Sequence, residues 1–284
     1  MSTDWAWAGV APYFPGVVSP TPPIWAYALP DGAARVEPLG DGVVVYARDA
    51  YAVLDGAGAL RWSEGRTAHA SPDAMGRYVF EHVGSAVRAR DAVDGHVIWE
   101  RAGDWAEGMA SAVLIHSIAE LPTTAVDPST AALLWQAPGA WNASGADRVG
   151  FGASGWICER EARSGAPAGC VTAPVYEERY GLFGAPLIVA GLQVGDEDDG
   201  RLVARDGSGK EVWARTGVVD AQRIDAAVPE QQRLLARLGG PGGPWATLDA
   251  TGRVLQVFGF GVLAARSSNR ILLIQGTQLL AWEL

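Results

Sequence analysis

The stretch that decides the fold is Ala89-Arg90-Asp91-Ala92-Val93-Asp94-Gly95-His96-Val97-Ile98-Trp99. It consists of an apolar strand, an acidic residue, a tight turn containing Gly, and a second apolar strand that carries Trp. Variants of it recur along the chain, with their Asp and Trp at Asp55 and Trp62, Asp127 and Trp135, and Asp206 and Trp213. Self-similarity at a fixed period is the signature of a repeat architecture, so the repeat determines how the rest of the chain is interpreted.

The spacing of the repeat gives the size of its structural unit. Trp25, Trp62, Trp99 and Trp135 are separated by 37, 37 and 36 residues. Runs rich in Val, Ile, Leu and aromatic residues, bounded by Gly, Pro, Asp and Asn, indicate further strands between them. These runs are Val43–Ala47, Arg77–Val83, Ala112–Ile118, Arg148–Ala153, Leu187–Val194, Arg233–Leu238 and Arg270–Gln275. Each period therefore supplies about four short strands, the content of one propeller blade.

The repeated residues have a structural explanation within such a blade. We expect the Asp to accept hydrogen bonds from backbone amides of the turn between the third and fourth strands, and the Gly to supply a positive φ. We expect the Trp to cover the gap to the next blade with a large apolar surface. The repeat degenerates in two places. Glu161 and Gly169 replace Asp and Trp in one copy, and Gln256 replaces the Trp that would follow Asp249.

The two ends of the repeat region complement each other. The last copy stops after a third strand, Gln278–Leu284, whereas Ile24–Leu29 is a fourth strand without the other three. We predict an all-β, seven-bladed β-propeller of four-stranded antiparallel blades, closed by this N-terminal strand, which completes the C-terminal blade. Closure removes free sheet edges, which are a liability. The expected organisation is an aromatic, Pro-rich arm over residues 1–23 and one propeller domain over residues 24–284.

The phrase Ala-x-Asp-x-x-(Thr/Ser/Asp)-Gly-x-x-x-Trp resembles the tryptophan-docking repeat of the quinoprotein-like (PQQ-like, WD40-like) bacterial β-propellers. The resemblance covers almost all of residues 24–284 and implies the propeller fold. It leaves the function open, because that family includes both dehydrogenases and non-catalytic scaffolds. The enzymes typically have eight blades, an adjacent-Cys disulfide and a calcium ion. Since this chain has no adjacent Cys pair, the resemblance implies the non-catalytic branch, with no cofactor.

Composition narrows the range of partners. The chain has 284 residues and a formal net charge of −10, which makes nucleic acid and anionic membrane poor partners. No window approaches 18 uncharged apolar residues, so no transmembrane helix is expected. The first residues show no secretory signal, and two Cys are too few for a disulfide framework. The expected location is the cytoplasm of a bacterium with GC-rich coding.

Several motifs are better explained by structure than by chemistry. The acidic run Gly195–Gly200 is expected to be a solvated hairpin turn. Gly150–Gly155 matches a dinucleotide fingerprint only in letters, because a strand rather than a helix follows it. The four His, at 69, 82, 96 and 116, show no metal-binding spacing, although His82 and His116 could converge at a pore. We expect no catalytic, cofactor or metal site.

Cys158 and Cys170 flank the hairpin of the copy that lacks its Trp. A disulfide across the hairpin is geometrically conceivable, but it needs an oxidising compartment. The favoured interpretation is a pair of packed free thiols that fill the space left by the missing Trp. Whether the two are bonded stays open.

The resulting hypothesis is a non-catalytic protein–protein interaction scaffold of a bacterial multi-component system. A partner is expected on the variable loops. The aromatics of the N-terminal arm, Trp5, Trp7, Tyr13 and Phe14, are expected to lie across the propeller and fill a groove. The alternative for the arm is that they anchor a partner, because exposed aromatics make binding hot spots. The alternative is a small-ligand-binding or hydrolytic propeller that uses the central pore. A quinone-dependent dehydrogenase is a third, weaker alternative, so enzymatic activity is left open with a leaning against it.

Overall fold

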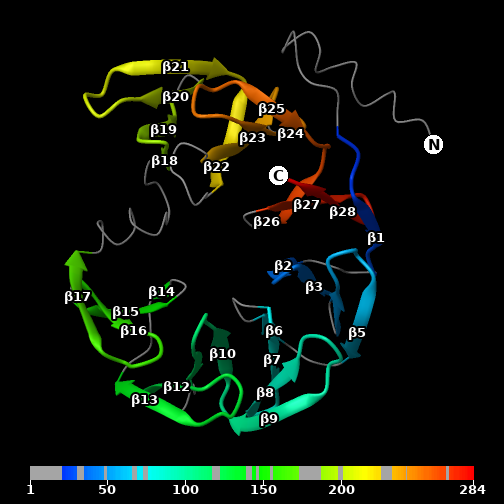
Figure 1. The fold of residues 1–284 in the computed structure, drawn as a ribbon, viewed down its shortest axis with the longest axis vertical. Coiled ribbons are helices and arrows are strands. Elements are labelled where there is room, and N and C mark those ends of the chain that lie inside the picture. The colour runs from blue at the N-terminus through cyan, green and yellow to red at the C-terminus, as the bar shows by residue number, and fades with distance from the viewer. Residues whose placement is uncertain are drawn as a thin grey trace. The chain divides into compact units, whose positions relative to one another are not determined.

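The structure is a computed structural model and contains only strands and connecting turns in the part of the chain that it describes. The described residues are 21–30, 35–47, 50–65, 69–72, 76–116, 122–138, 143–144, 147–153, 156–172, 187–197, 201–224, 232–240, 242–266 and 269–284. The strands form seven four-stranded antiparallel sheets, which we number in chain order (Figure 1). No helix of the described residues has the length and apolarity needed to cross a membrane.

The chain divides into two compact units, and the first of them, residues 29–182, contains four sheets. We call it the four-sheet unit. Sheet 1 has β2 (Arg35–Leu39), β3 (Gly42–Tyr46), β4 (Ala50–Leu54) and β5 (Leu60–Gly65). Sheet 2 has β6 (His69–Pro72), β7 (Tyr78–Val83), β8 (Ala86–Asp91) and β9 (Val97–Ala102). Sheet 3 has β10 (Trp105–Gly108), β11 (Val113–His116), β12 (Pro122–Val126) and β13 (Leu133–Pro138), and sheet 4 has β14 (Ala143–Ser144), β15 (Arg148–Ala153), β16 (Trp156–Glu161) and β17 (Pro167–Thr172).

The second unit combines residues 1–28 with residues 183–284 and contains three sheets. We call it the three-sheet unit. Sheet 5 has β18 (Leu187–Val189), β19 (Leu192–Asp196), β20 (Arg201–Arg205) and β21 (Glu211–Thr216). Sheet 6 has β22 (Val218–Ile224), β23 (Arg233–Leu238), β24 (Trp245–Leu248) and β25 (Val254–Val257). Sheet 7 has β26 (Val262–Arg266), β27 (Arg270–Gln275) and β28 (Gln278–Glu283), followed in space by β1 (Trp25–Ala28).

The strand that completes sheet 7 comes from the other end of the chain. β1 pairs antiparallel with β28, with Trp25 opposite Ala281 and Ala28 opposite Gln278; in Figure 1 the blue β1 lies beside the red β28. The amide of Ile24 also donates to the carbonyl of Ala281, 2.7 Å away. The expected pairing of the N-terminal strand with the C-terminal sheet is therefore observed.

One predicted strand is wrong. The apolar run Leu187–Val194 was expected to be continuous, but it folds into the hairpin of β18 and β19. Ala190 and Gly191 form its turn, with φ of 49° and 80°. Gly191 takes a positive φ at little cost. Together with the small Ala190 before it, it forms a two-residue turn inside the apolar run. The expected turn at Gly195–Gly200 lies partly outside the described residues.

The hydrophobic core lies between consecutive sheets. One cluster joins Val44 and Val53 of sheet 1 to Val79 of sheet 2, and others join sheets 2 and 3, 3 and 4, 5 and 6, and 6 and 7. Because side chains alternate between the two faces of a strand, middle strands that face a neighbour on both sides are apolar on both faces. In β7 of sheet 2, for example, Val79 packs in the cluster shared with sheet 1 and Phe80 in the cluster shared with sheet 3.

Candidate functional site

The Trp side chains of the repeat link each sheet to the next. In the four-sheet unit the indole Nε1 of Trp62 donates to the carbonyl of Ala92 at 3.2 Å, that of Trp99 to Pro128 at 2.8 Å, and that of Trp135 to Ala162 at 2.8 Å. In the three-sheet unit the Trp213 indole donates to Ala250 at 2.8 Å. Every acceptor is the residue directly after the acidic residue of the next sheet's turn, so the bond ties a fourth strand to the following turn.

The turn glycine lies against the docked ring. A Cβ placed on Gly95 would come 2.7 Å from Cδ2 of Trp62, one on Gly165 2.6 Å from Cγ of Trp135, and one on Gly252 2.8 Å from Cδ2 of Trp213. These distances are too short for any side chain, and the three glycines also have positive φ. Sheet 3 departs from the expectation of Gly, since Ala131 holds this turn position with φ of 56°.

The acidic residues of the repeat organise the turns. Oδ1 of Asp55 accepts from the amides of Ala57 and Ala59, both at 2.9 Å. The same bond to the amide two residues on is made by Asp91, Asp127, Asp206 and Asp249, at distances of 2.7, 3.0, 2.8 and 2.9 Å. Hydrogen bonds from the Ser129 and Ser208 side chains hold the pKa of Asp127 and of Asp206 below its usual range. These carboxylates stabilise the turns between the third and fourth strands.

The remaining repeat positions are less regular. Gln256 stands in a Trp position, and its Nε2 donates to the carbonyl of Glu283 at 3.2 Å, which keeps a polar version of the docking bond. Trp25 lies in β1 opposite Ala281. Trp282, one residue before the acidic position of sheet 7, docks instead on the carbonyl of Thr21 at 2.8 Å. Gly169 has no side chain, and a Cβ added to it would meet nothing within 4 Å.

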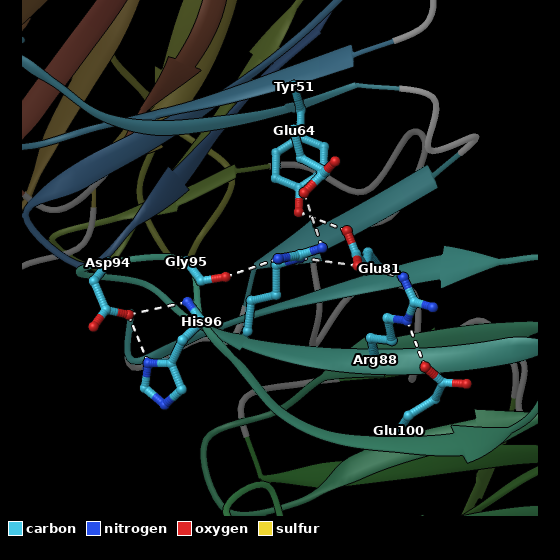
Figure 2. A network of polar contacts seen from close by, with 9 residues as sticks. Tyr51, Glu64, Glu81, Arg88, Asp94, Gly95, His96 and Glu100 are labelled. Atoms are coloured by element: carbon cyan, nitrogen blue, oxygen red, sulfur yellow. Dashed lines mark hydrogen bonds and ion pairs between the residues drawn. The ribbon is translucent and has the colours of Figure 1, made fainter.

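A buried charge network joins sheets 1 and 2 (Figure 2). Glu81 of β7 is 1% exposed. Its Oε2 accepts from the hydroxyl of Tyr51 at 2.9 Å, and its Oε1 forms ion pairs with Nε of Arg90 at 2.9 Å and with Nη1 of Arg88 at 3.8 Å. Arg90 also pairs through Nη2 with Glu64 at 2.9 Å. Tyr51 and Glu64 come from sheet 1, so the network spans the gap between the two sheets.

The contacts of this network stabilise the structure and leave none of its groups available as a catalyst. The third nitrogen of Arg90, Nη1, donates to the carbonyl of Gly95 at 2.8 Å, so all three nitrogens of the guanidinium have partners. Burial, followed by the charge of Glu81, raises the pKa of the Tyr51 phenol well above its ordinary value. A phenol that holds its proton and a carboxylate paired with arginine offer neither a base nor a nucleophile. The same holds for Tyr46, whose hydroxyl donates to Glu37 at 2.8 Å and whose pKa burial raises.

Sequence reasoning missed the role of the arginine before the turn acid. Arg90, Arg160 and Arg205 occupy the same position in sheets 2, 4 and 5, and each donates through Nη1 to the carbonyl of the turn glycine: Gly95 at 2.8 Å, Gly165 at 2.9 Å and Gly209 at 3.5 Å. The signal was present as Arg-(Asp/Glu) followed three or four residues after the acid by Gly. It is a turn-stabilising feature that sequence reasoning assigned only to Asp and Gly.

One surface group in the described residues has the composition of a metal site. Ligand atoms of Asp91, Asp94 and His96 lie within 4.8 Å of one another. Oδ1 of Asp94 accepts from the amide of His96 at 3.0 Å and lies 2.6 Å from its Nδ1 (Figure 2), and these bonds lower the pKa of Asp94. Asp94 and His96 are exposed, and the contacts within the turn account for this arrangement without an ion. We assign no metal to it.

The two cysteines are bonded. Cys158 of β16 and Cys170 of β17 are directly opposite each other, with Cα atoms 4.0 Å apart, and form a disulfide. The favoured interpretation of packed free thiols is therefore wrong. Their location is also different, since neighbouring residues of a strand point to opposite faces. Gly169, the residue directly before Cys170, faces the side of the missing Trp. Cys170 therefore faces the opposite side and cannot fill that space.

Other candidate residues stand in matching strand positions or lie outside the described part. His82 and His116 lie near the ends of β7 and β11, the second strands of sheets 2 and 3, and neither belongs to the Asp91 group. Their convergence at a pore stays a prediction. His116 pairs with Trp105 in the ladder of sheet 3. The aromatic arm, with Trp5, Trp7, Tyr13 and Phe14, lies outside the described residues.

No protein-family model matches the chain, and the search of curated proteins finds no match. Solved structures do match. The crystal structure of BamB from Moraxella catarrhalis has a TM-score of 0.58 and 15% identity, and the match covers 92% of this chain and 99% of that chain. The fold is that of a β-propeller.

Two other structures are similar over most of their length. The Cps50 (Swd1) β-propeller domain of Myceliophteria thermophila has a TM-score of 0.47 and 10% identity, over 91% of this chain and 98% of that one. BBS1N, solved in complex with ARL6DN, has a TM-score of 0.45 and 12% identity, over 94% and 92%.

Proposed function

We propose that the chain is a non-catalytic scaffold that binds a protein partner through an aromatic surface at one end of its sheets. The observation that carries this proposal is the exposure of two tryptophans, Trp105 at 40% and Trp156 at 50%. Tryptophan is enriched at protein interfaces and at their energetic centres, because a large flat apolar side chain gains much from burial by a partner.

The two tryptophans lie at corresponding ends of neighbouring sheets. Trp105 is the first residue of β10 and Trp156 the first residue of β16. In each sheet the first and third strands run in the same direction and end near the acidic turn, so both tryptophans lie at the end opposite those turns. Trp135 of sheet 3 docks on the turn of sheet 4, which places the turn ends of the two sheets together. The opposite ends, with Trp105 and Trp156, therefore share one side of the four-sheet unit.

The buried charged groups support binding over catalysis. Glu81 and Glu64 both pair with Arg90, and Tyr46 and Tyr51 donate to carboxylates. An enzyme of the pore-using type would need polar groups that face a substrate, whereas the groups of this network face one another. The network therefore gives no support to the ligand-binding, hydrolytic and quinone-dependent alternatives.

We further propose that the seven sheets close into one ring, in a single domain over residues 24–284. Support comes from the pairing of β1 with β28 and from the BamB match, which covers 92% of this chain. A cytoplasmic location and membership of a bacterial multi-component system remain proposals as well. The disulfide weighs against the cytoplasm, because such bonds persist mainly in oxidising compartments.

The test uses the full chain as bait in extracts of its source cells, with cross-linking and quantitative mass spectrometry. The double variant Trp105→Ser/Trp156→Ser should lose a partner that the unaltered chain retains. The matched control is Leu60→Ser/Leu133→Ser, which removes side chains of similar exposure, 54% and 53%, from strand starts next to the acidic turns. This control should keep the partner, and all variants should keep their melting temperature.

Two results would contradict the scaffold proposal: the unaltered chain recovers no stable partner, or both double variants recover it equally. A chain shortened by residues 1–20 separates the contribution of the aromatic arm. If Trp5, Trp7, Tyr13 and Phe14 anchor the partner, this shortened chain should lose it while Trp105 and Trp156 are intact.

A further inference from the structure

The disulfide of sheet 4 occupies a cross-strand position that sheets 2 and 3 fill with polar pairs. The third and fourth strands place Arg88 opposite Glu100 in sheet 2, Thr124 opposite Gln136 in sheet 3, and Cys158 opposite Cys170 in sheet 4. Nε of Arg88 donates to Glu100 at 2.6 Å, and Nε2 of Gln136 donates to the Thr124 hydroxyl at 3.0 Å. The cross-strand position is thus used for side-chain links in all three sheets, and only sheet 4 makes the link covalent.

The position is accessible to solvent. Glu100, Gln136 and Cys170 are all exposed, and Cys158 is half-buried. β17 is the terminal strand of its sheet, so one of its edges has no strand paired to it within the described residues. A disulfide in this location is open to thiol reagents, in contrast to one buried between sheets.

β17 also lacks the anchor that holds the other fourth strands of the four-sheet unit. β5, β9 and β13 each carry a Trp that docks on the next turn, through Trp62, Trp99 and Trp135. Gly169 stands in this position of β17. The disulfide is therefore the strongest side-chain link between β17 and its sheet.

We propose that Cys158–Cys170 is a reversible thiol–disulfide exchange site, which dithiol reductants reach in the folded protein and whose reduction loosens β17 without unfolding the other sheets. One thiolate of the reductant attacks Sγ of Cys170, the more exposed residue. The Cys158 sulfur leaves as a thiolate and takes up a proton. The second thiol of the reductant then attacks the mixed disulfide, releases Cys170 as a thiol and closes the reductant into a disulfide. Two electrons and two protons pass from the dithiol to the protein.

The test applies dithiothreitol to the full chain without denaturant, followed by alkylation with iodoacetamide and mass spectrometry. The rate of reduction should increase in proportion to the dithiothreitol concentration and exceed the rate of global unfolding. In the reduced protein, amide hydrogen exchange in β17 should accelerate by about tenfold or more, because local opening becomes easier. Exchange in sheets 1 and 2 should stay the same.

The matched control is Cys158→Thr/Cys170→Gln, which reproduces the polar pair of sheet 3. Its exchange rates should not respond to dithiothreitol, and β17 should exchange at a rate close to that of the reduced protein. The proposal is overturned if reduction saturates at the rate of global unfolding, if reduction accelerates exchange in all sheets, or if both cysteines of the untreated protein alkylate. None of these outcomes depends on a protein partner, so the exchange site and the scaffold function stand or fall separately.

Discussion

At the scale of single residues, the docking contact is so tight that the turn beneath the indole has no room for a side chain. Gly252 and Gly209 provide a matched comparison, because both lie three residues after the turn Asp and have φ of 77° and 84°. Only Gly252 lies under a ring, that of Trp213, whereas a Cβ on Gly209 would meet nothing within 4 Å. The pair separates the cost of backbone conformation from the cost of close approach.

We predict that Gly209→Ala lowers the free energy of unfolding by roughly 1–2 kcal/mol, the cost of the left-handed conformation for a residue with a Cβ. Gly252→Ala should cost a further 1–3 kcal/mol or so, because the added methyl group displaces the Trp213 ring. Urea denaturation of both variants measures the difference. Equal losses in the two variants would show that the indole yields without cost.

The buried phenols give the stability a dependence on alkaline pH. The pKa of Tyr51 and of Tyr46 in the folded chain is raised above the ordinary value of 10.0, by burial first and then by Glu81 and Glu37. Above pH 10 the unfolded chain releases these protons while the folded chain retains them. Linkage then requires that this contribution to stability is complete below pH 10 and declines as the pH rises above it.

We predict that the free energy of unfolding falls more steeply above pH 10 in the unaltered chain than in Tyr46→Phe/Tyr51→Phe. The double variant starts from a lower value at neutral pH, because Glu37 and Glu81 each lose a hydrogen-bond donor. Chemical denaturation at a series of pH values measures both slopes. Parallel slopes would mean that the phenols ionise in the folded chain.

At the scale of elements, the interface between sheets 1 and 2 depends on charge pairing inside an apolar core. Glu81 and Glu100 both pair with Arg88, but Glu81 is 1% exposed whereas the Glu100 side chain is 49% exposed. Breaking a buried pair leaves a charge without compensation, and an exposed pair contributes little because water screens it.

We predict that Glu81→Gln destabilises the chain by about 3–5 kcal/mol, since Arg90 loses its most buried partner. Glu100→Gln, which removes the exposed partner of the same Arg88, should change stability by less than about 1 kcal/mol. Thermal and urea unfolding of the two variants provide the comparison. A Glu81 variant as stable as the Glu100 variant would contradict the structural role of the network.

At the scale of the whole molecule, stability depends on a strand that enters from the far end of the chain. β1 pairs with β28, and the segment before it supplies the acceptor for the Trp282 indole at Thr21. Without them β28 becomes an open edge and Trp282 loses its polar partner. An open, apolar edge strand also favours association between chains.

We predict that removal of residues 1–30 lowers the melting temperature strongly and promotes aggregation, whereas removal of residues 1–20 leaves it within a few degrees. The shorter deletion keeps Thr21 and β1 and serves as the control. Differential scanning calorimetry and light scattering measure both effects. An unchanged melting temperature after the longer deletion would show that sheet 7 is stable with three strands.

Much of the strand pattern could be predicted from the sequence, because turn geometry and apolar alternation are local properties. Short sequence motifs were enough to recognise the period of 37 residues, the Asp and Gly of the turns, and the missing fourth strand of the last repeat. The error at Leu187–Val194 arose where an apolar run masked a two-residue turn. The arginines before the turn acid were not foreseen, because their partners depend on how the turn carbonyls are oriented.

What the sequence determined by itself was therefore the repeat and its strand order, since hydrogen-bonded turns and two-residue periodicity are encoded locally. Tertiary structure alone decided which groups meet across sheets, as in the pairing of Arg90 with Glu64, and which side chains stay uncovered, as in the exposure of Trp105 and Trp156. Such contacts join residues that are distant in the chain, or depend on which face of a strand is left uncovered. Neither property can be read from local spacing, because the packing of one sheet on the next fixes both.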